Sequence, residues 1–460
     1  MMSSFTKQKE GYLSLVKKMG QYEEALCLLN WDLRTGSPKK GVERRSEVIG
    51  LLSTESFKLS VSEEMEGYLH FFSDPANVDK LEPMEQKMVM ESNREFNLSR
   101  RIPADEYEAY VVLTAQSESV WEEAKDQSNF AMFQPYLEKI VATTQHFIDL
   151  WGYEGHKYNA LLDQYEPGMT IAQLDQIFGS LKEQLIPLVS AVGQSEHQPD
   201  THFLNQRFTK SQQQAFNIYI LKELGYDFAA GRLDETVHPF AMTVNLGDVR
   251  ITTRYLEDQV VSALFGTIHE CGHALYEQNI SPLLLGTNLC TGTTMGIHES
   301  QSRFWENVVG RSRAFWQRYF PHLQQAFPGQ LDDVSSEQFY QAINEAKPSL
   351  VRIEADELTY NLHIIMRYEM EKALIGGDVK VADLPAYWNE KSQQYFGIVP
   401  PDDGMGVLQD VHWSGGSFGY FPSYALGNMY AAQFTHTLKQ QMPTLMQTLP
   451  QGNLRQSNLG

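Results

Sequence analysis

Two histidines lie four residues apart in the segment 269–273, and a glutamate directly follows the first of them. In an α-helix, residues four apart lie one turn above each other, so both imidazoles point at the same place. Two imidazole nitrogens suit a Zn²⁺ ion, and Glu270 lies where it can accept a proton from a water molecule at that ion. His269 and His273 are therefore predicted to bind one zinc ion per chain.

The sequence around this motif predicts a buried helix. VVSALFGTI precedes it and ALYEQN follows it, with apolar residues at helical spacing. Cys271 is two helical positions from His269, about 200° around the axis, so we expect an inert buried thiol that points away from the metal. Gly272 costs a helix ~1 kcal/mol, and we expect its missing side chain to let another backbone segment approach closely.

A catalytic zinc ion needs a third protein ligand and one open position. Glu299 and His298, which open the next predicted helix, are both chemically able to serve, and so is Glu277, one turn further along the first helix. The spacing favours Glu299, because a carboxylate about 26 residues after the second histidine is a common arrangement in zincins.

These residues need a scaffold, and the sequence predicts a mainly α-helical one. Residues 1–225 read as helix after helix, and 238–254 read as a β-hairpin about Asn245-Leu246-Gly247-Asp248. Helical character resumes at about Asp258, and the Gly- and aromatic-rich stretch 404–428 is expected to be a functional loop. We predict a single catalytic domain: a helical scaffold lobe at 1–225, an active-site region at 226–447 and a loose tail at 448–460.

The composition excludes several classes of function. A net charge of −21 repels phosphate backbones, so nucleic acid is not an expected partner. Three widely spaced cysteines fit a reducing compartment. The sequence has no apolar leader at its beginning and no apolar run near the ~18 residues of a membrane span, so we expect a cytoplasmic protein without membrane contact.

The chain resembles the carboxypeptidase Taq family of metallocarboxypeptidases. The resemblance rests on segments that occur in the family's order, with a weaker match at Trp31-Asp32. The segments are 238–240 (HPF), 248–252 (DVRIT), 269–273 (HECGH), 298–301 (HESQ), 351–356 (VRIEAD) and 406–413 (GVLQDVHW). The family usually has Met-Pro where this chain has Ser37-Pro38, a departure in the scaffold.

The resemblance implies a nearly all-α fold with a long groove, and a homodimer. It implies metal-dependent release of C-terminal residues with broad specificity, with proline poorly accepted. It assigns His269, His273 and Glu299 as metal ligands and Glu270 as general base. Co²⁺ or Mn²⁺ could occupy the same ligands in place of zinc.

The oxyanion that develops during peptide hydrolysis needs hydrogen-bond donors. His412 is one expected donor because its segment matches the family. Analogy with other helical zincins points to Tyr424 as the second, with Tyr420 as its substitute. The alternative for Tyr420 is core packing, since this stretch gathers aromatic residues around glycines.

A carboxypeptidase must also bind the free C-terminal carboxylate of its peptide substrate, for which the planar fork of arginine is suited. We expect Arg352 to do so, although a local ion pair with Glu354 or Asp356 is the alternative. Arg250 is the other candidate for the carboxylate, but it shares a strand face with Asp248, so an ion pair between these two residues is its plausible alternative role. His238 and Arg250 are then expected to shape the groove wall.

Two other functions remain open at the level of sequence. An oligoendopeptidase could use the same zinc centre, but segment 351–356 argues against it. A helical binding or scaffold protein could hold a vestigial zinc site, but the joint presence of Glu270 and His412 argues against that.

Overall fold

The computed structural model describes residues 4–442, and the first half of the described chain is helical, as predicted. Ten α-helices and two 3₁₀ turns, η1 (Lys39–Gly41) and η2 (His202–Asn205), fill residues 4–224. The helices are α1 (Ser4–Thr35), α2 (Val42–Ser60), α3 (Glu63–Phe72), α4 (Pro75–Val78), α5 (Pro83–Ser99), α6 (Ala104–Asp126), α7 (Phe130–Trp151), α8 (Tyr158–Tyr165), α9 (Ile171–Gly193) and α10 (Lys210–Leu224).

The predicted hairpin is present, and a third strand extends it. Strand β2 (Ala241–Asn245) pairs antiparallel with β3 (Asp248–Thr253), and β1 (Leu233–Glu235) pairs parallel with β3 on the other side. Val249 and Ile251 of β3 are buried against the core that contains the next helix. The sequence did not predict β1, because a three-residue strand is too short to show an alternating pattern.

The second half returns to helices, with further 3₁₀ turns η3 (Pro282–Leu284), η5 (Arg352–Glu354) and η6 (Val381–Asp383) between them. The helices are α11 (Val260–Gln278), α12 (Met295–Arg303), the π-helical turn η4 (Phe304–Gly310), α13 (Arg313–Ala326), α14 (Ser336–Ile343), α15 (Glu357–Gly376), α16 (Leu384–Phe396) and α17 (Phe421–Gln441).

The loop expected over 404–428 is shorter than predicted. It ends at Tyr420, and α17 begins at Phe421 with Pro422 in its first turn, where the fixed φ of proline suits a helix start. Gly427, one of the glycines that suggested a loop, lies inside α17, where a Cβ would come too close to Glu299. The tail predicted at 448–460 lies outside the described residues.

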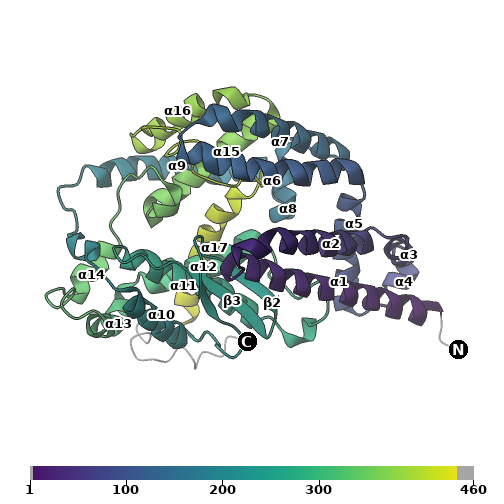
Figure 1. Cartoon of the computed structure of the whole chain (residues 1–460), viewed down its shortest axis with the longest axis horizontal. Helices are drawn as coiled ribbons and strands as arrows, with labels where there is room; N and C mark the ends of the chain where they lie inside the picture. The colour runs from purple at the N-terminus through teal and green to yellow at the C-terminus, as the bar shows by residue number, and fades with distance from the viewer. Residues whose placement is uncertain (1–3, 443–460) are drawn as a thin grey trace.

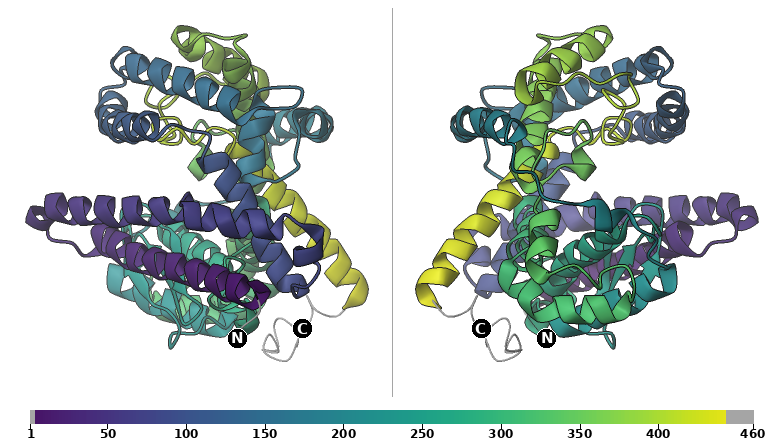
Figure 2. Two further views of the ribbon diagram at one scale, coloured as in Figure 1. Left: turned by 90° about the vertical axis from the view of Figure 1, so that its right-hand side faces the viewer. Right: turned by 90° about the vertical axis from the view of Figure 1, so that its left-hand side faces the viewer.

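Two groups of helices lie one above the other (Figure 1). The upper group contains α6, α7, α9, α15 and α16, and with α8 and the start of α17 it forms one large hydrophobic core. The lower group contains α10, α11, α13 and α14 with the sheet around a second core, and α1, α3 and α5 enclose a third. Helix α17 runs from the upper group into the lower one (Figure 2).

Candidate metal centre and active site

Helix α11 presents His269 and His273 on the same face, with their ring centroids 4.9 Å apart. Glu299 of α12 faces both of them. Its Oε2 lies 3.6 Å from Nε2 of His269 and 3.4 Å from Nε2 of His273. One ligand atom from each of the three residues lies within 4.8 Å of the others. Two imidazole nitrogens and a carboxylate oxygen form a donor set that fits zinc and related divalent ions.

Two glycines allow the helices of the site to pack this closely. A Cβ on Gly272 would lie 2.6 Å from the Gln301 carbonyl oxygen and from Cα of Ser302. A Cβ on Gly427 of α17 would lie 2.6 Å from Cγ of Glu299. The close backbone approach expected at Gly272 is therefore confirmed, and Gly427 performs the same task on the other side of α12.

Each histidine uses its other ring nitrogen to contact the protein. Nδ1 of His269 lies 2.9 Å from Oε2 of Glu306. Nδ1 of His273 lies 2.6 Å from Nδ1 of His298, whose Nε2 lies 2.8 Å from Oε1 of Glu277. His298 and Glu277, the alternative third ligands, thus stand behind His273. Such contacts orient a ligand imidazole toward the metal.

Charges around the site keep Glu299 ionised. Burial alone would raise its pKa, but Arg303 and the two histidines hold the pKa well below its usual range. Nε of Arg303 donates to Oε1 of Glu299 at 2.7 Å, and the same guanidinium lies 3.2 Å from Glu306. Sequence reasoning missed Arg303 and Glu306. Their spacing of four and seven residues after Glu299 would place them on its helix face, which was the available indication.

Glu270 directly follows His269 but is not one of the three converging groups. Its side chain is buried, and burial raises its pKa to about 7. A carboxyl group with a pKa near neutrality can both accept and return a proton, as a general base requires.

Cys271 is fully buried and belongs to the hydrophobic core of the lower group, and burial raises the pKa of its thiol.

The loop before α17 brings His412 to Tyr424. Nε2 of His412 lies 3.2 Å from the Tyr424 hydroxyl, while its buried Nδ1 has no partner among the described residues. Burial and the nearby Arg352 guanidinium lower the pKa of His412 to about 4, so the ring is neutral at pH 7.

Tyr420 packs edge-on against Tyr165 and Tyr424. Burial raises the pKa of both Tyr420 and Tyr424, and the negative charge of Glu299 raises both further.

Arg352 is buried in this same region. It forms an ion pair, but with neither Glu354 nor Asp356, the two partners considered from sequence. Its Nε and Nη2 lie 2.8 Å from Oδ1 of Asp410, and its Nη1 donates to the Tyr360 hydroxyl at 3.1 Å. Asp356 instead accepts backbone hydrogen bonds at the start of α15. The local alternative is therefore wrong, because the partner comes from a distant loop. Asp410 also binds Arg367 at 2.6 Å.

Arg250 pairs with Asp248, as expected for residues on one strand face. Two of its nitrogens lie 2.7 and 2.6 Å from the two carboxylate oxygens, and its guanidinium lies 5.4 Å from the centroid of the Trp31 ring. His238 is exposed in the turn before β2.

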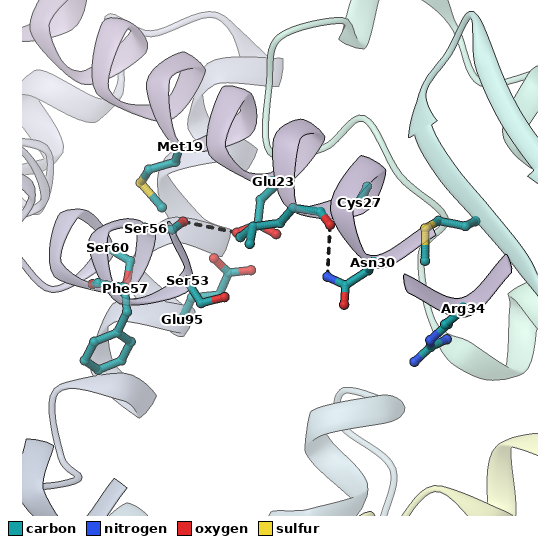
Figure 3. Close-up of a pocket in the computed structure, with 12 residues that line it drawn as sticks. Met19, Glu23, Cys27, Asn30, Arg34, Ser53, Ser56, Phe57, Ser60 and Glu95 are labelled. Atoms are coloured by element: carbon teal, nitrogen blue, oxygen red, sulfur yellow. Dashed lines mark hydrogen bonds between the residues drawn. The ribbon is translucent and has the colours of Figure 1, made fainter. Parts of the chain in front are cut away.

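A pocket of about 570 Å³ opens elsewhere, between α1, α2, α5 and β2. Glu23 and Glu95 line it, and Oγ of Ser56 donates to Oε1 of Glu23 at 3.1 Å. Figure 3 shows this contact as a dashed line. The lining includes none of the residues that converge at the metal centre.

No helix among residues 4–442 is long and apolar enough to cross a membrane.

Comparison with known proteins identifies relatives along the whole chain. Residues 11–458 match the model of the carboxypeptidase Taq (M32) metallopeptidases. Carboxypeptidase 1 of Bacillus subtilis is 51% identical over 451 residues, covering 98% of this chain and 89% of the relative. Thermostable carboxypeptidase 1 of Thermus thermophilus is 40% identical over 440 residues, covering 93% and 86%.

Solved structures agree with these matches. The crystal structure titled BsuCP superposes with a TM-score of 0.91 at 51% identity, covering 97% of this chain and 89% of that one. The M32 carboxypeptidase of Deinococcus radiodurans R1 superposes with a TM-score of 0.93 at 36% identity, with the same coverage. The fold is therefore the mainly helical fold of these carboxypeptidases, and the chain belongs to the carboxypeptidase Taq (M32) family of metallopeptidases.

Proposed function

We propose that this metallocarboxypeptidase uses one zinc ion, held by His269, His273 and Glu299, to release C-terminal amino acids from peptides with broad specificity and little activity before proline. The observation that carries the proposal is the convergence of those three side chains, with the buried Glu270 directly following His269 on the same helix. Zinc bound there would polarise the scissile carbonyl and lower the pKa of a water molecule. Cobalt or manganese would fit the same donors.

Glu270 is the proposed general base. It follows a metal ligand on a rigid helix, so its carboxylate is fixed relative to the metal. It accepts a proton from the attacking water and returns that proton to the leaving amine.

His412 and Tyr424 are the proposed donors to the developing oxyanion, with Tyr420 as the substitute for Tyr424. The contact between His412 and the Tyr424 hydroxyl supports this pairing, since it fixes both groups before substrate arrives. Preorganised donors cost no rearrangement during the reaction. A neutral His412 keeps one N–H, which is the donor that the oxyanion requires.

Arg352 is the proposed binding group for the substrate's C-terminal carboxylate. A guanidinium has five N–H groups, and three are directed at Asp410 and Tyr360. One N–H on Nη1 and one on Nη2 remain, and these are the groups proposed to donate to the carboxylate. Asp410, held from its other side by Arg367, keeps the plane of the guanidinium fixed. Arg250 and His238 are left to shape the groove wall.

The decisive experiment compares a peptide that has a free C-terminus with the same peptide amidated. Mass spectrometry of the products over time should show a ladder of single-residue losses from the free acid and little reaction of the amide. Activity should disappear with a chelator and return with zinc. Internal cleavage of both peptides at similar rates would favour the oligoendopeptidase alternative instead.

Two further expectations are part of the proposal. A homodimer should appear as twice the chain mass of 52.5 kDa in light scattering. The cytoplasmic location is testable by cell fractionation.

A further inference from the structure

Glu166 is a buried carboxylate that no step of the proposed reaction uses. It directly follows α8 and is only 4% exposed. It accepts hydrogen bonds from the backbone N–H of Gly296 and from Oγ of Ser423, the latter at 3.2 Å. Burial raises the pKa of Glu166, and these donors oppose that shift. A buried carboxylate with donors from two distant segments ties those segments together.

Both donors lie in the first turn of a helix. Gly296 is the second residue of α12, and Ser423 is the third residue of α17. The first N–H groups of a helix have no partner within it, and a negative charge is favourable at that end. Glu166 therefore acts on the start of α12 and the start of α17 at the same time.

These two helices carry groups from different halves of the proposed site. Glu299, the third metal ligand, lies one turn after Gly296. Tyr424, a proposed oxyanion donor, directly follows Ser423. The distance between ligand and donor thus depends on how the starts of α12 and α17 are held relative to each other.

The packing around Glu166 leaves little tolerance for movement. A Cβ on Gly296 would lie 2.7 Å from Oε1 of Glu166 and 3.1 Å from the Tyr430 ring. Further along the same pair of helices, Gly427 lies directly against Glu299. Glycines therefore allow α12 and α17 to come into contact, and Glu166 holds the first turns of the two helices together.

We propose that Glu166 is a positioning residue, which fixes α12 and α17 relative to each other and so sets the place of Tyr424 relative to the metal ligand Glu299. The inference rests on the roles proposed above for these two residues. It differs from a purely structural role, because loss of the link should change catalysis and metal binding beyond any loss of stability.

The test uses variants that cut one link at a time. Ser423→Ala removes the link to α17 alone and should lower kcat about 10-fold, with bound zinc and KM nearly unchanged. Glu166→Gln keeps the size and shape of the side chain but removes the negative charge that lies at the first turns of both helices. It should lower kcat further and also speed the release of zinc to a chelator.

Thr170→Ala is the matched control. Thr170 lies four residues after Glu166 and caps only α9, with its side chain accepting from the Gln173 N–H. Its loss should lower the Tm of unfolding while leaving kcat and zinc release unchanged. If Ser423→Ala and Glu166→Gln behave like Thr170→Ala, with a lower Tm alone, Glu166 is structural and the inference is wrong.

A double-mutant cycle separates this inference from the proposed function. If Ser423 acts through Tyr424, Ser423→Ala should have almost no effect on kcat in a Tyr424→Phe background. An undiminished effect there would overturn the inference. If Tyr424→Phe alone retains full kcat, the donor role of Tyr424 in the proposed function fails instead. Zinc release from Glu166→Gln then decides the inference: a rate equal to wild type would overturn it.

Discussion

Helix α11 supplies three of the proposed site residues within five positions, whereas Arg352, His412 and Tyr424 come from three separate segments. Helical spacing alone brings His269 and His273 together. In the second region, an ion-pair network among Arg352, Asp410 and Arg367 is needed to hold the segments in place. The comparison teaches that side chains carried by one helix converge without help from distant segments. Side chains carried by separate segments converge only through contacts between parts of the chain that are far apart in sequence.

The largest effect should come from removing the one metal ligand that α11 does not supply. Glu299→Ala should abolish zinc binding and activity, because two imidazoles alone leave the ion without its carboxylate. His298→Ala should retain zinc, with affinity weakened about 10–100-fold, since it only orients His273. Metal analysis after dialysis measures both. Full zinc in Glu299→Ala with loss in His298→Ala would reverse the assignment.

Glu270→Gln should separate metal binding from chemistry within α11. The amide keeps the size of the side chain but cannot accept the proton, so zinc content should be normal and kcat should fall ~10²–10⁴-fold. Steady-state kinetics with parallel metal analysis gives the answer. A near-normal kcat would rule out Glu270 as the base.

Tyr424→Phe tests the second region by removing one hydroxyl. It should lower kcat ~10²-fold and leave zinc content unchanged, since the phenol contacts His412 rather than the metal ligands. Tyr420→Phe is the matched control. If the control shows the large effect, the donor is Tyr420, and if neither variant does, the aromatic cluster is structural.

Arg352→Ala should remove the preference for a free C-terminus. A charge-assisted hydrogen bond of this kind contributes about 1.5–3 kcal/mol, or roughly 10–150-fold in kcat/KM on the free acid, with little change on the amide. Arg352→Lys should recover only part, because an ammonium keeps the charge but not the fork.

The comparison of two substrates cancels general damage to the enzyme, since a misfolded variant loses both activities. Arg250→Ala serves as the control on the hairpin, where Asp248 already occupies the guanidinium. If Arg250→Ala abolishes the preference and Arg352→Ala retains it, the carboxylate is bound at the hairpin.

The smallest effect concerns pH and Asp410. Burial would raise the pKa of Asp410, but Arg352 and Arg367 hold it below its ordinary range. A depressed pKa means that the ionised carboxylate stabilises the fold above the unfolded pKa of ~3.9 and that this contribution is lost as pH falls further. Asp410→Asn should therefore be less stable than wild type at pH 7, and the difference in unfolding free energy should narrow below about pH 4. Urea unfolding at several pH values measures this, and a gap that stays constant would contradict it.

Sequence patterns predicted much of the fold because they report short-range physics. Apolar spacing predicted the helices of residues 4–224, and Asn245-Leu246-Gly247-Asp248 predicted the turn between β2 and β3. The patterns failed for β1 and at the start of α17. Strand β1 is decided by its pairing with β3, which no local pattern reports. The start of α17 did have a local signal, Pro422 in its first turn, but the many glycines of the segment obscured it.

The same division applies to the site. The spacing of His269 and His273 determined that both imidazoles lie on one helix face, because the α-helix repeats every 3.6 residues. Only the tertiary structure decided that Glu299 faces that helix while His298 and Glu277 stand behind it, since Gly272 and Gly427 set how closely three helices pack. Only the tertiary structure gave Arg352 its partner Asp410 and placed Glu166 between α12 and α17. Buried charges take their partners from whichever segment folding brings near, and sequence spacing carries no record of that choice.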